Sequence, residues 1–278
     1  MIIDCQVHVY ERNSPDRPWT SHLAGPPEVT GDQMIAAMDS VGVDAAIIVS
    51  VWSYYRYDPS YAVSVRDACP ERFALVAPVD PADPASAEII ADLAETKGAV
   101  GIRLFELPED PRDPGLRQTV EAAQRHSIVV NLLAHEKLES ADAIVAAYPD
   151  CQFALDHLGM RPAPAPPIHP NPFADLEKVA ALARHENLAI KLSGVGSMSA
   201  DAYPFPDVWD PVLRLVDAFG VDRCMWGSDW TRALDFLSYR ESVDMFRLNR
   251  AFSDSDRTAL MGGALQRVYR WQPSGRAA

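Results

Sequence analysis

Eight short apolar runs, rich in β-branched residues, recur along the whole chain and alternate with stretches of helical character. The stretches between them, such as GDQMIAAMDSVG and FADLEKVAALARHE, place apolar residues at three- and four-residue steps, as amphipathic helices do. Eight strand–helix units with parallel strands close more naturally into a barrel than into an open sheet. We therefore predict an α/β protein, a (β/α)8 TIM barrel, with strands at 1–8, 44–51, 72–79, 98–105, 128–134, 152–157, 188–193 and 223–229.

Size and charge narrow the class of protein further. The chain has 278 residues, close to the roughly 250 typical of this barrel. It has no linker or break in composition, so we predict a single domain over residues 1–278. A net charge of −14 argues against nucleic acid and anionic membranes as partners. An anionic small-molecule substrate would therefore have to be bound by local arginines.

The sequence also bears on the cellular compartment. The N-terminus has no basic segment followed by a long apolar run, so we expect neither a signal peptide nor a membrane span. The four cysteines lie far apart without a Cys-x-x-Cys motif and are interpreted as reduced thiols of a cytoplasmic protein. A homo-oligomer is compatible with these features.

Polar residues interrupt the apolar pattern at the predicted strand ends, where barrel enzymes carry their functional side chains. Alternation places Asp4, Gln6 and His8 on one face of the first strand. The sixth strand ends with His157, on the face of Phe153 and Leu155, and the eighth ends with Asp229. Gly227 is expected to leave space beside that carboxylate. Arg103 lies inside the fourth strand, where a buried cation needs an anionic partner.

Each of these residues also has a purely structural interpretation. A histidine at a strand end commonly only satisfies hydrogen bonds, and an aspartate before a helix is often an N-cap. Polar groups on four strand ends of one barrel favour a shared site. His135 and His169 are candidate rim residues, whereas the other histidines outside the strands are assigned to the surface. The irregular stretch 159–173 holds six prolines and is interpreted either as a lid or as a plain solvated connection.

With these residues in place, the chain resembles the amidohydrolase-2 type of the amidohydrolase superfamily. It resembles in particular the lactonase branch, which includes 2-pyrone-4,6-dicarboxylate lactonase and fuconolactonase-like hydrolases. The resemblance runs from end to end and rests on the segments IDCQVHVY, PERFALVAPVDPADP, GAVGIRLF, FALDHLGMRP, NLAIKLSG, RCMWGSDWTR and LMGGALQRVYRW.

The resemblance implies a distorted barrel whose site lies at the carboxyl ends of strands one, six and eight. It assigns Asp229 to the carboxylate that activates water, His157 to the sixth-strand histidine and His8 to the second histidine of a His-x-His motif. Arg103 matches an arginine that holds a substrate carboxylate. Gln6 departs from the pattern, because it stands where the family has the first histidine.

That departure bears on the cofactor. Zinc sites use at least three imidazole, thiolate or carboxylate ligands, and a glutamine amide is a poor one. Only His8, His157 and Asp229 remain as a ligand set. We therefore expect hydrolysis without a metal, with zinc or another divalent ion at low occupancy as the alternative.

The resulting hypothesis is a hydrolase that opens a small, carboxylated lactone. Asp229 would act as base, while His8 and His157 would donate to the carbonyl oxygen. The predicted substrate contacts are Gln6, Arg103, Arg161, Trp52 and Tyr54, the two aromatic residues having ordinary packing as an equal interpretation. The alternatives are a metal-dependent decarboxylase or hydrolase of the same superfamily and an inactive barrel that binds a small carboxylate.

Overall fold

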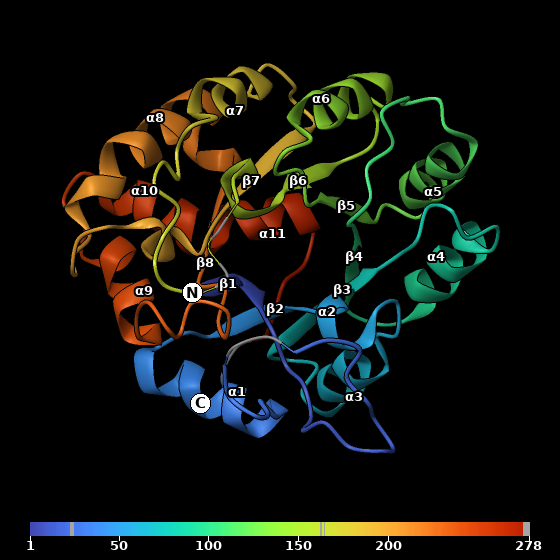
Figure 1. Ribbon diagram of the computed structural model, residues 1–278, viewed down its shortest axis with the longest axis horizontal. Coiled ribbons are helices and arrows are strands. Elements are labelled where there is room, and N and C mark those ends of the chain that lie inside the picture. The colour runs from blue at the N-terminus through green and yellow to red at the C-terminus, as the bar shows by residue number, and fades with distance from the viewer. Residues whose placement is uncertain (23–24, 162, 164, 275–278) are drawn as a thin grey trace.

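The computed structural model describes residues 1–22, 25–161, 163 and 165–274. Eight parallel strands form one sheet in which every strand pairs with its neighbours in chain order. The predicted barrel is confirmed, and Figure 1 shows its helices surrounding the strands. The strands are β1 (Ile3–Val7), β2 (Ala45–Val49), β3 (Phe73–Pro78), β4 (Ala99–Leu104), β5 (Val129–Leu132), β6 (Phe153–Leu155), β7 (Leu188–Ser193) and β8 (Cys224–Gly227).

The helices follow the predicted amphipathic stretches, and several begin at clear capping signals. Thr30 and Ser238 each form a capping box at the start of α1 and α9, and Asp113 caps α5 ahead of a proline. No helix in the described part of the chain is both long and apolar enough to cross a bilayer. The α-helices are α1 (Gly31–Val41), α2 (Trp52–Tyr55), α3 (Ser60–Ala68), α4 (Ser86–Glu95), α5 (Pro114–Arg125), α6 (Leu138–Ala147), α7 (Leu176–Leu182), α8 (Trp209–Phe219), α9 (Tyr239–Arg247), α10 (Asp254–Thr258) and α11 (Ala264–Tyr269). Shorter helical turns are η1 (Asp156–Gly159), η2 (Val195–Met198), η3 (Pro206–Val208), η4 (Val221–Arg223) and the π-turn η5 (Ala259–Gly263).

The first and last strands meet through hydrogen bonds at and beyond their carboxyl ends. The backbone N–H of His8 donates to the carbonyl of Trp230 at 2.8 Å, and that of Asp229 donates to the carbonyl of Gln6 at 3.0 Å. This junction holds the segment after β8 against β1. It therefore brings Asp229 next to His8, although 221 residues separate them.

The register of β1 against β2 shifts between Asp4 and Val7. The Asp4 carboxylate accepts from the Tyr239 hydroxyl of α9 outside the barrel, whereas Gln6 contacts Lys191 of β7. The expectation that Asp4, Gln6 and His8 share one face was therefore wrong. An irregularity of this kind breaks the two-residue alternation on which that expectation rested.

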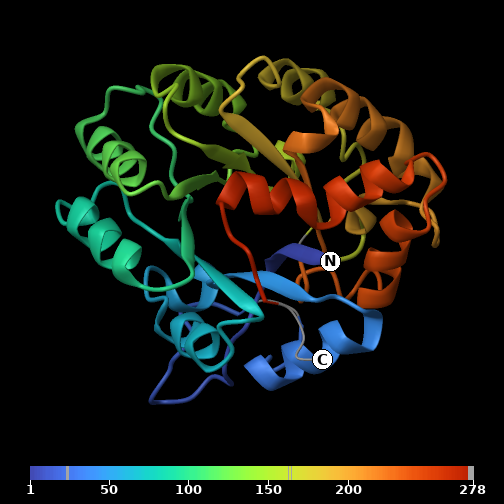
Figure 2. The same ribbon diagram turned by 180° about the vertical axis from the view of Figure 1, so that it is seen from behind.

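The core has two layers. On β7, Leu188, Ile190 and Leu192 pack outward against the helices, while Ala189 packs into the barrel. One end of the barrel interior is filled by α11, whose Leu265 and neighbouring residues pack against Ile3, Ile47 and Val76. Figure 2 shows α11, in red, crossing the barrel when the molecule is seen from behind. The opposite end, at the carboxyl ends of the strands, is left open for a pocket.

Candidate active site

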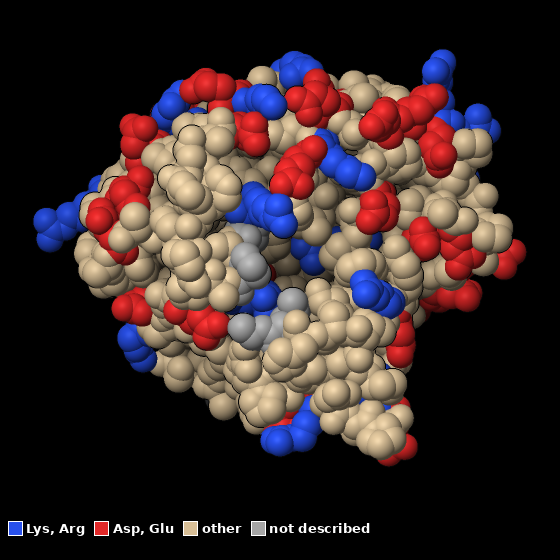
Figure 3. Space-filling view, viewed as in Figure 1, with Lys and Arg blue, Asp and Glu red and all other residues tan. Residues whose placement is uncertain are grey.

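A cavity of about 270 Å³ opens at the carboxyl ends of the strands. The space-filling view shows it as a hollow near the centre of the face, with basic side chains inside it and at its rim (Figure 3). Its lining combines histidines, arginines, one carboxylate and several apolar groups, as expected of a small-molecule site. The lining residues are His8, Val51, Trp52, Ser53, Arg103, Phe105, Leu133, His135, His157, Arg161, Ala163, Ser197, Asp229 and Arg232.

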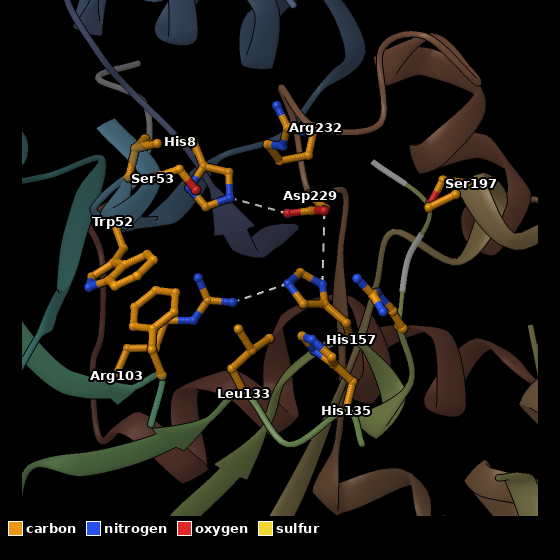
Figure 4. A pocket seen from close by; sticks show the side chains of 14 residues that line it. His8, Trp52, Ser53, Arg103, Leu133, His135, His157, Ser197, Asp229 and Arg232 are labelled. Carbon is orange, nitrogen blue, oxygen red and sulfur yellow. Dashed lines mark hydrogen bonds and ion pairs between the residues drawn. The ribbon is translucent and has the colours of Figure 1, made fainter. Parts of the chain in front are cut away.

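Asp229 and His8 face each other across the junction between β8 and β1. The Nε2 atom of His8 lies 3.2 Å from Oδ1 of Asp229, as Figure 4 shows. The Nδ1 atom of His8 lies 2.7 Å from the carbonyl oxygen of Val49. A carbonyl only accepts, so Nδ1 carries a proton. The contact to Asp229 is then a hydrogen bond when His8 carries a second proton on Nε2.

The backbone around Asp229 brings the carboxylate close to β7. Strand β8 ends at Gly227, and Asp229 has a left-handed φ of 56°. The predicted role of Gly227 was wrong, because a Cβ there would meet Cys5 Sγ at 2.8 Å. The glycine beside the carboxylate is Gly194, with φ of 71°, where a Cβ would lie 3.3 Å from that of Asp229.

His157 lies just after β6 and not within it. The strand ends at Leu155, and His157 has a left-handed φ of 50°, so strand alternation does not set its direction. Its Nε2 lies 3.2 Å from Nη2 of Arg103, and its Nδ1 lies 3.0 Å from Oγ of Ser193 and 3.9 Å from Oδ2 of Asp229. Because arginine only donates, Nε2 of His157 is an acceptor. This orientation differs from the expected donation by His157 to a substrate carbonyl.

Burial and charge set the protonation states of this pair. Burial alone would raise the pKa of Asp229, but the neighbouring His157 and His8 hold it below its ordinary value. Burial lowers the pKa of His157, an effect that Asp229 partly offsets. Both directions favour an ionised Asp229 beside a neutral His157 at neutral pH.

Arg103 reaches the pocket from β4. Its Nε donates to Oδ2 of Asp156 at 2.6 Å, which identifies the anionic partner that a buried cation needs. The guanidinium carbon lies 4.6 Å from the centre of the Phe105 ring, and Phe105 in turn stacks on Trp52 with ring centres 4.8 Å apart. The pocket wall on this side is therefore a cation above stacked aromatic rings.

The other predicted substrate contacts divide into two groups. Trp52 and Arg161 line the pocket, and Arg161 pairs with Glu136 at 2.8 Å near the rim. Gln6 and Tyr54 do not belong to the lining. Gln6 is fully buried and accepts from Lys191, and Tyr54 packs against Tyr10 and Trp19 in an aromatic cluster. The proposed lid contributes Arg161 and Ala163, while its positions 162 and 164 lie outside the described residues.

Four ionisable residues at or beneath the pocket were not assigned to the site from the sequence. Arg232 lines the pocket three residues after Asp229, and His135, considered only for the rim, lines it after β5. Asp156 and Lys191 lie beneath it as a buried ion pair, with Nζ 3.0 Å from Oδ1. Lys191 had a usable signal, because it interrupts the apolar run NLAIKLS as Arg103 interrupts GAVGIRLF.

The donor groups of the site bear on whether it can hold a divalent metal. The described residues include no group of three or more His, Cys, Asp or Glu placed to hold a metal ion. Although His8 and Asp229 face each other, Nε2 of His157 faces the guanidinium of Arg103, and Oε1 of Gln6 already accepts from a lysine ammonium. In this arrangement His8, His157, Asp229 and Gln6 do not provide the three or more ligands that a zinc site requires.

Comparison with known proteins adds a sequence relationship to this geometry. The family described as Amidohydrolase matches residues 3–271. An L-fucono-1,5-lactonase from Burkholderia ambifaria is 33% identical over 150 residues, which cover 51% of this chain and 49% of that enzyme, about half its length. A 4-sulfomuconolactone hydrolase from Rhizobium radiobacter is 25% identical over 240 residues, covering 84% of this chain and 75% of that enzyme.

Solved structures show the same fold. A crystal structure of an amidohydrolase from Burkholderia multivorans with bound zinc superposes with a TM-score of 0.80 at 24% identity. The superposition covers 98% of this chain and 100% of that one. At this identity the likeness establishes the barrel architecture alone.

Proposed function

Because the chain belongs to the amidohydrolase family, we propose that it hydrolyses the ester bond of a small carboxylated lactone, using water activated by Asp229 and no metal. One observation carries the proposal. The buried carboxylate of Asp229 lies at the pocket, 3.2 Å from His8 and 3.9 Å from His157. Its lowered pKa keeps it ionised, so that it can act as a base at neutral pH.

In the proposed reaction Asp229 takes a proton from water while the water oxygen bonds to the lactone carbonyl carbon. The carbonyl electron pair moves onto oxygen and forms a tetrahedral oxyanion. Collapse of this intermediate breaks the ring C–O bond, and the proton on Asp229 passes to the leaving alkoxide. The product is the open-chain hydroxy acid, and Asp229 is regenerated.

The oxyanion requires donors directed into the cavity. His8 supplies one when its ring carries a second proton, on Nε2, because that atom lies beside the base and His8 lines the pocket. His157 is better placed to orient Asp229 electrostatically, since its only proton in the neutral form is on Nδ1, which lies 3.0 Å from Oγ of Ser193 and 3.9 Å, beyond hydrogen-bond distance, from the carboxylate. We therefore assign donation to His8 and orientation of the base to His157.

The substrate class follows from the charge of the lining. Three arginines line the cavity, Arg103, Arg161 and Arg232, in a chain whose net charge is −14. Cationic groups concentrated in one hollow of an acidic protein favour a substrate with a carboxylate. The stacked rings of Trp52 and Phe105 would contact the flat or apolar part of the ring.

The test is a screen of sugar lactones, muconolactones and pyrone carboxylates, with products measured in both directions. Each carboxylated lactone is compared with an uncharged analogue, and an Asp229→Asn protein controls for contaminating esterase. The expected result is turnover of a carboxylated lactone by the wild type alone.

The same screen separates the alternatives. Metal is measured in protein purified without chelator, and the active lactone is assayed again after chelation. Retained turnover supports the metal-free reaction, whereas its loss would assign the site to a metal-dependent hydrolase or decarboxylase. Binding of a small carboxylate without turnover of any lactone would leave a binding protein in place of an enzyme.

A further inference from the structure

A line of buried polar contacts runs beneath the pocket and ends at its histidine. Nζ of Lys191 lies 3.0 Å from Oδ1 of Asp156, and Oδ2 of Asp156 accepts from Nε of Arg103 at 2.6 Å. Nη2 of Arg103 then donates to Nε2 of His157 at 3.2 Å. All four side chains are buried, and Asp156 and Lys191 do not line the cavity.

Stability alone gives a weak reason for this arrangement. Removing charges from water is costly, and buried ion pairs are often no more stable than apolar residues of similar volume. The side chains of Asp156 and Lys191 are both 0% exposed. A role in setting the geometry of Arg103 and His157 accounts for the charges more fully.

The geometry of arginine makes such a role specific. The guanidinium is planar, so an acceptor on Nε fixes the direction of the N–H groups on both Nη atoms. Asp156 holds Nε, and the Phe105 ring, 4.6 Å from the guanidinium carbon, lies against it. With its plane held in this way, Arg103 directs one N–H at His157 and keeps others for the pocket that it lines.

The direction of that N–H decides the tautomer of His157. An arginine donor on Nε2 leaves the single proton of the neutral imidazole on Nδ1. Nδ1 faces Ser193 at 3.0 Å and the Asp229 carboxylate at 3.9 Å. The opposite tautomer would place N–H against N–H at Arg103 and a lone pair toward the carboxylate.

We propose that Asp156, paired with Lys191, is a positioning residue that orients Arg103 and thereby fixes His157 as the Nδ1–H tautomer directed toward Asp229. Asp156 itself touches no substrate. The consequence for turnover rests on the proposed lactonase function, whereas the tautomer of His157 is a property of the protein that can be measured without any substrate.

The surface of the protein offers a matched control. Asp142 contacts Arg184, and its Oδ1 lies 2.6 Å from Nε2 of His185. This cluster therefore also combines a carboxylate with an arginine and a histidine. None of these three residues lines the pocket. Replacing Asp142 by Asn removes the same kind of charge without affecting the site.

The decisive measurement is the nitrogen NMR spectrum of the full chain labelled with ¹⁵N-histidine. The His157 signals are assigned by their loss in a His157→Gln protein. In the wild type and in Asp142→Asn, His157 should show a single Nδ1–H tautomer. In Asp156→Asn the Nε2–H form should appear as a substantial population. A folded Asp156→Asn protein in which His157 keeps only the Nδ1–H form would overturn the proposal.

A second variant covers the case in which Asp156→Asn does not fold. The double variant Asp156→Asn/Lys191→Met removes the carboxylate together with its ammonium partner and leaves fewer unpaired buried charges. It should show the same mixed tautomers of His157. A single Nδ1–H form in the double variant would refute positioning by Asp156 in the same way.

Kinetics provide an independent readout on any lactone found in the screen. The kcat/KM of Asp156→Asn for a carboxylated lactone should fall about 10–100-fold, as expected for a misplaced site group, with most of the loss in KM. Asp142→Asn should remain within about twofold of the wild type, as surface substitutions usually do. Unchanged kinetics with mixed tautomers would show that the tautomer does not matter for turnover and would reject the positioning role. If no lactone is turned over, the proposed function fails, and the NMR result still decides the structural part.

Discussion

The two ends of the barrel are built from the same strands but filled with opposite chemistry. At one end, α11 inserts Leu265 and its neighbours into an apolar layer that includes Ile3 and Ile47. At the other, Asp229, His157 and Arg103 occupy a cavity, and a lysine–aspartate pair lies beneath them. The first arrangement buries apolar area and stabilises the fold. The arrangement at the open end buries charged groups, which must be paired. It also places polar side chains around a cavity, as a binding or catalytic site requires.

Tyr269 connects the two ends. Its hydroxyl donates to Oδ1 of Asn131 at 2.5 Å, and its ring lies 5.9 Å from the Lys191 ammonium. The closing helix therefore also provides part of the environment of the buried ion pair. We therefore expect substitutions at the pocket end of the barrel to change activity and substitutions at the end filled by α11 to change stability.

Replacement of Asp229 by Asn should produce the largest effect. The change preserves shape but removes the base, so kcat should fall by roughly 10²–10⁴. Turnover of the lactone identified in the screen provides the measurement, with circular dichroism confirming that the protein is folded. A variant that keeps more than about a tenth of the wild-type kcat, well outside that range, would show that Asp229 is not the base.

Replacement of Leu265 by Ala should affect the opposite property. Leu265 is 1% exposed in the apolar layer, and truncating a buried leucine costs about 2–5 kcal/mol of unfolding free energy. Denaturant unfolding measures this loss, while KM of the folded variant should be unchanged. A large change in KM without loss of stability would contradict the division between the two ends.

Asp4 belongs to β1, its side chain contacts Tyr239 of α9 on the outside of the barrel, and it should make stability depend on pH. Burial raises the pKa of Asp4 from 3.8 to about 6 in the folded protein. Well below pH 3.8 the carboxyl is protonated in both states, and its stabilising contribution is complete. As pH rises toward 6 the unfolded state releases its proton first, so this contribution is lost.

The measurement is the difference in unfolding free energy between the wild type and Asp4→Asn across this range. The wild type should lose stability relative to the variant between about pH 4 and pH 6, by an amount on the order of 3 kcal/mol, and the difference should be constant above that. A difference that does not vary with pH would mean that folding does not raise the pKa of Asp4.

Replacement of Arg103 by Met should have a smaller effect, concentrated in substrate binding. Losing a charged hydrogen bond should raise KM for a carboxylated lactone by the equivalent of about 2 kcal/mol, or roughly 30-fold. The uncharged analogue of the same lactone is the control and should be much less affected. If the variant has the wild-type KM for the carboxylated lactone and for its uncharged analogue, Arg103 does not bind the substrate carboxylate.

The sequence by itself determined the barrel, because strand and helix periodicities are local and eight alternating units leave few other ways to close. It also located His8, His157, Asp229 and Arg103, since polar residues at strand ends interrupt that periodicity. It did not determine their directions. His157 and Asp229 lie just beyond strands β6 and β8 with left-handed backbones, where alternation no longer applies.

Only the tertiary structure decided which groups pair. Arg103 meets Asp156 across 53 residues, and Lys191 meets Gln6 across 185. Gln6 was expected to contact the substrate but instead lies in a buried network with Lys191. Likewise, Nε2 of His157 faces Arg103. Hydrogen-bond partners depend on the distances between atoms from different strands, and those distances exist only once the barrel has closed.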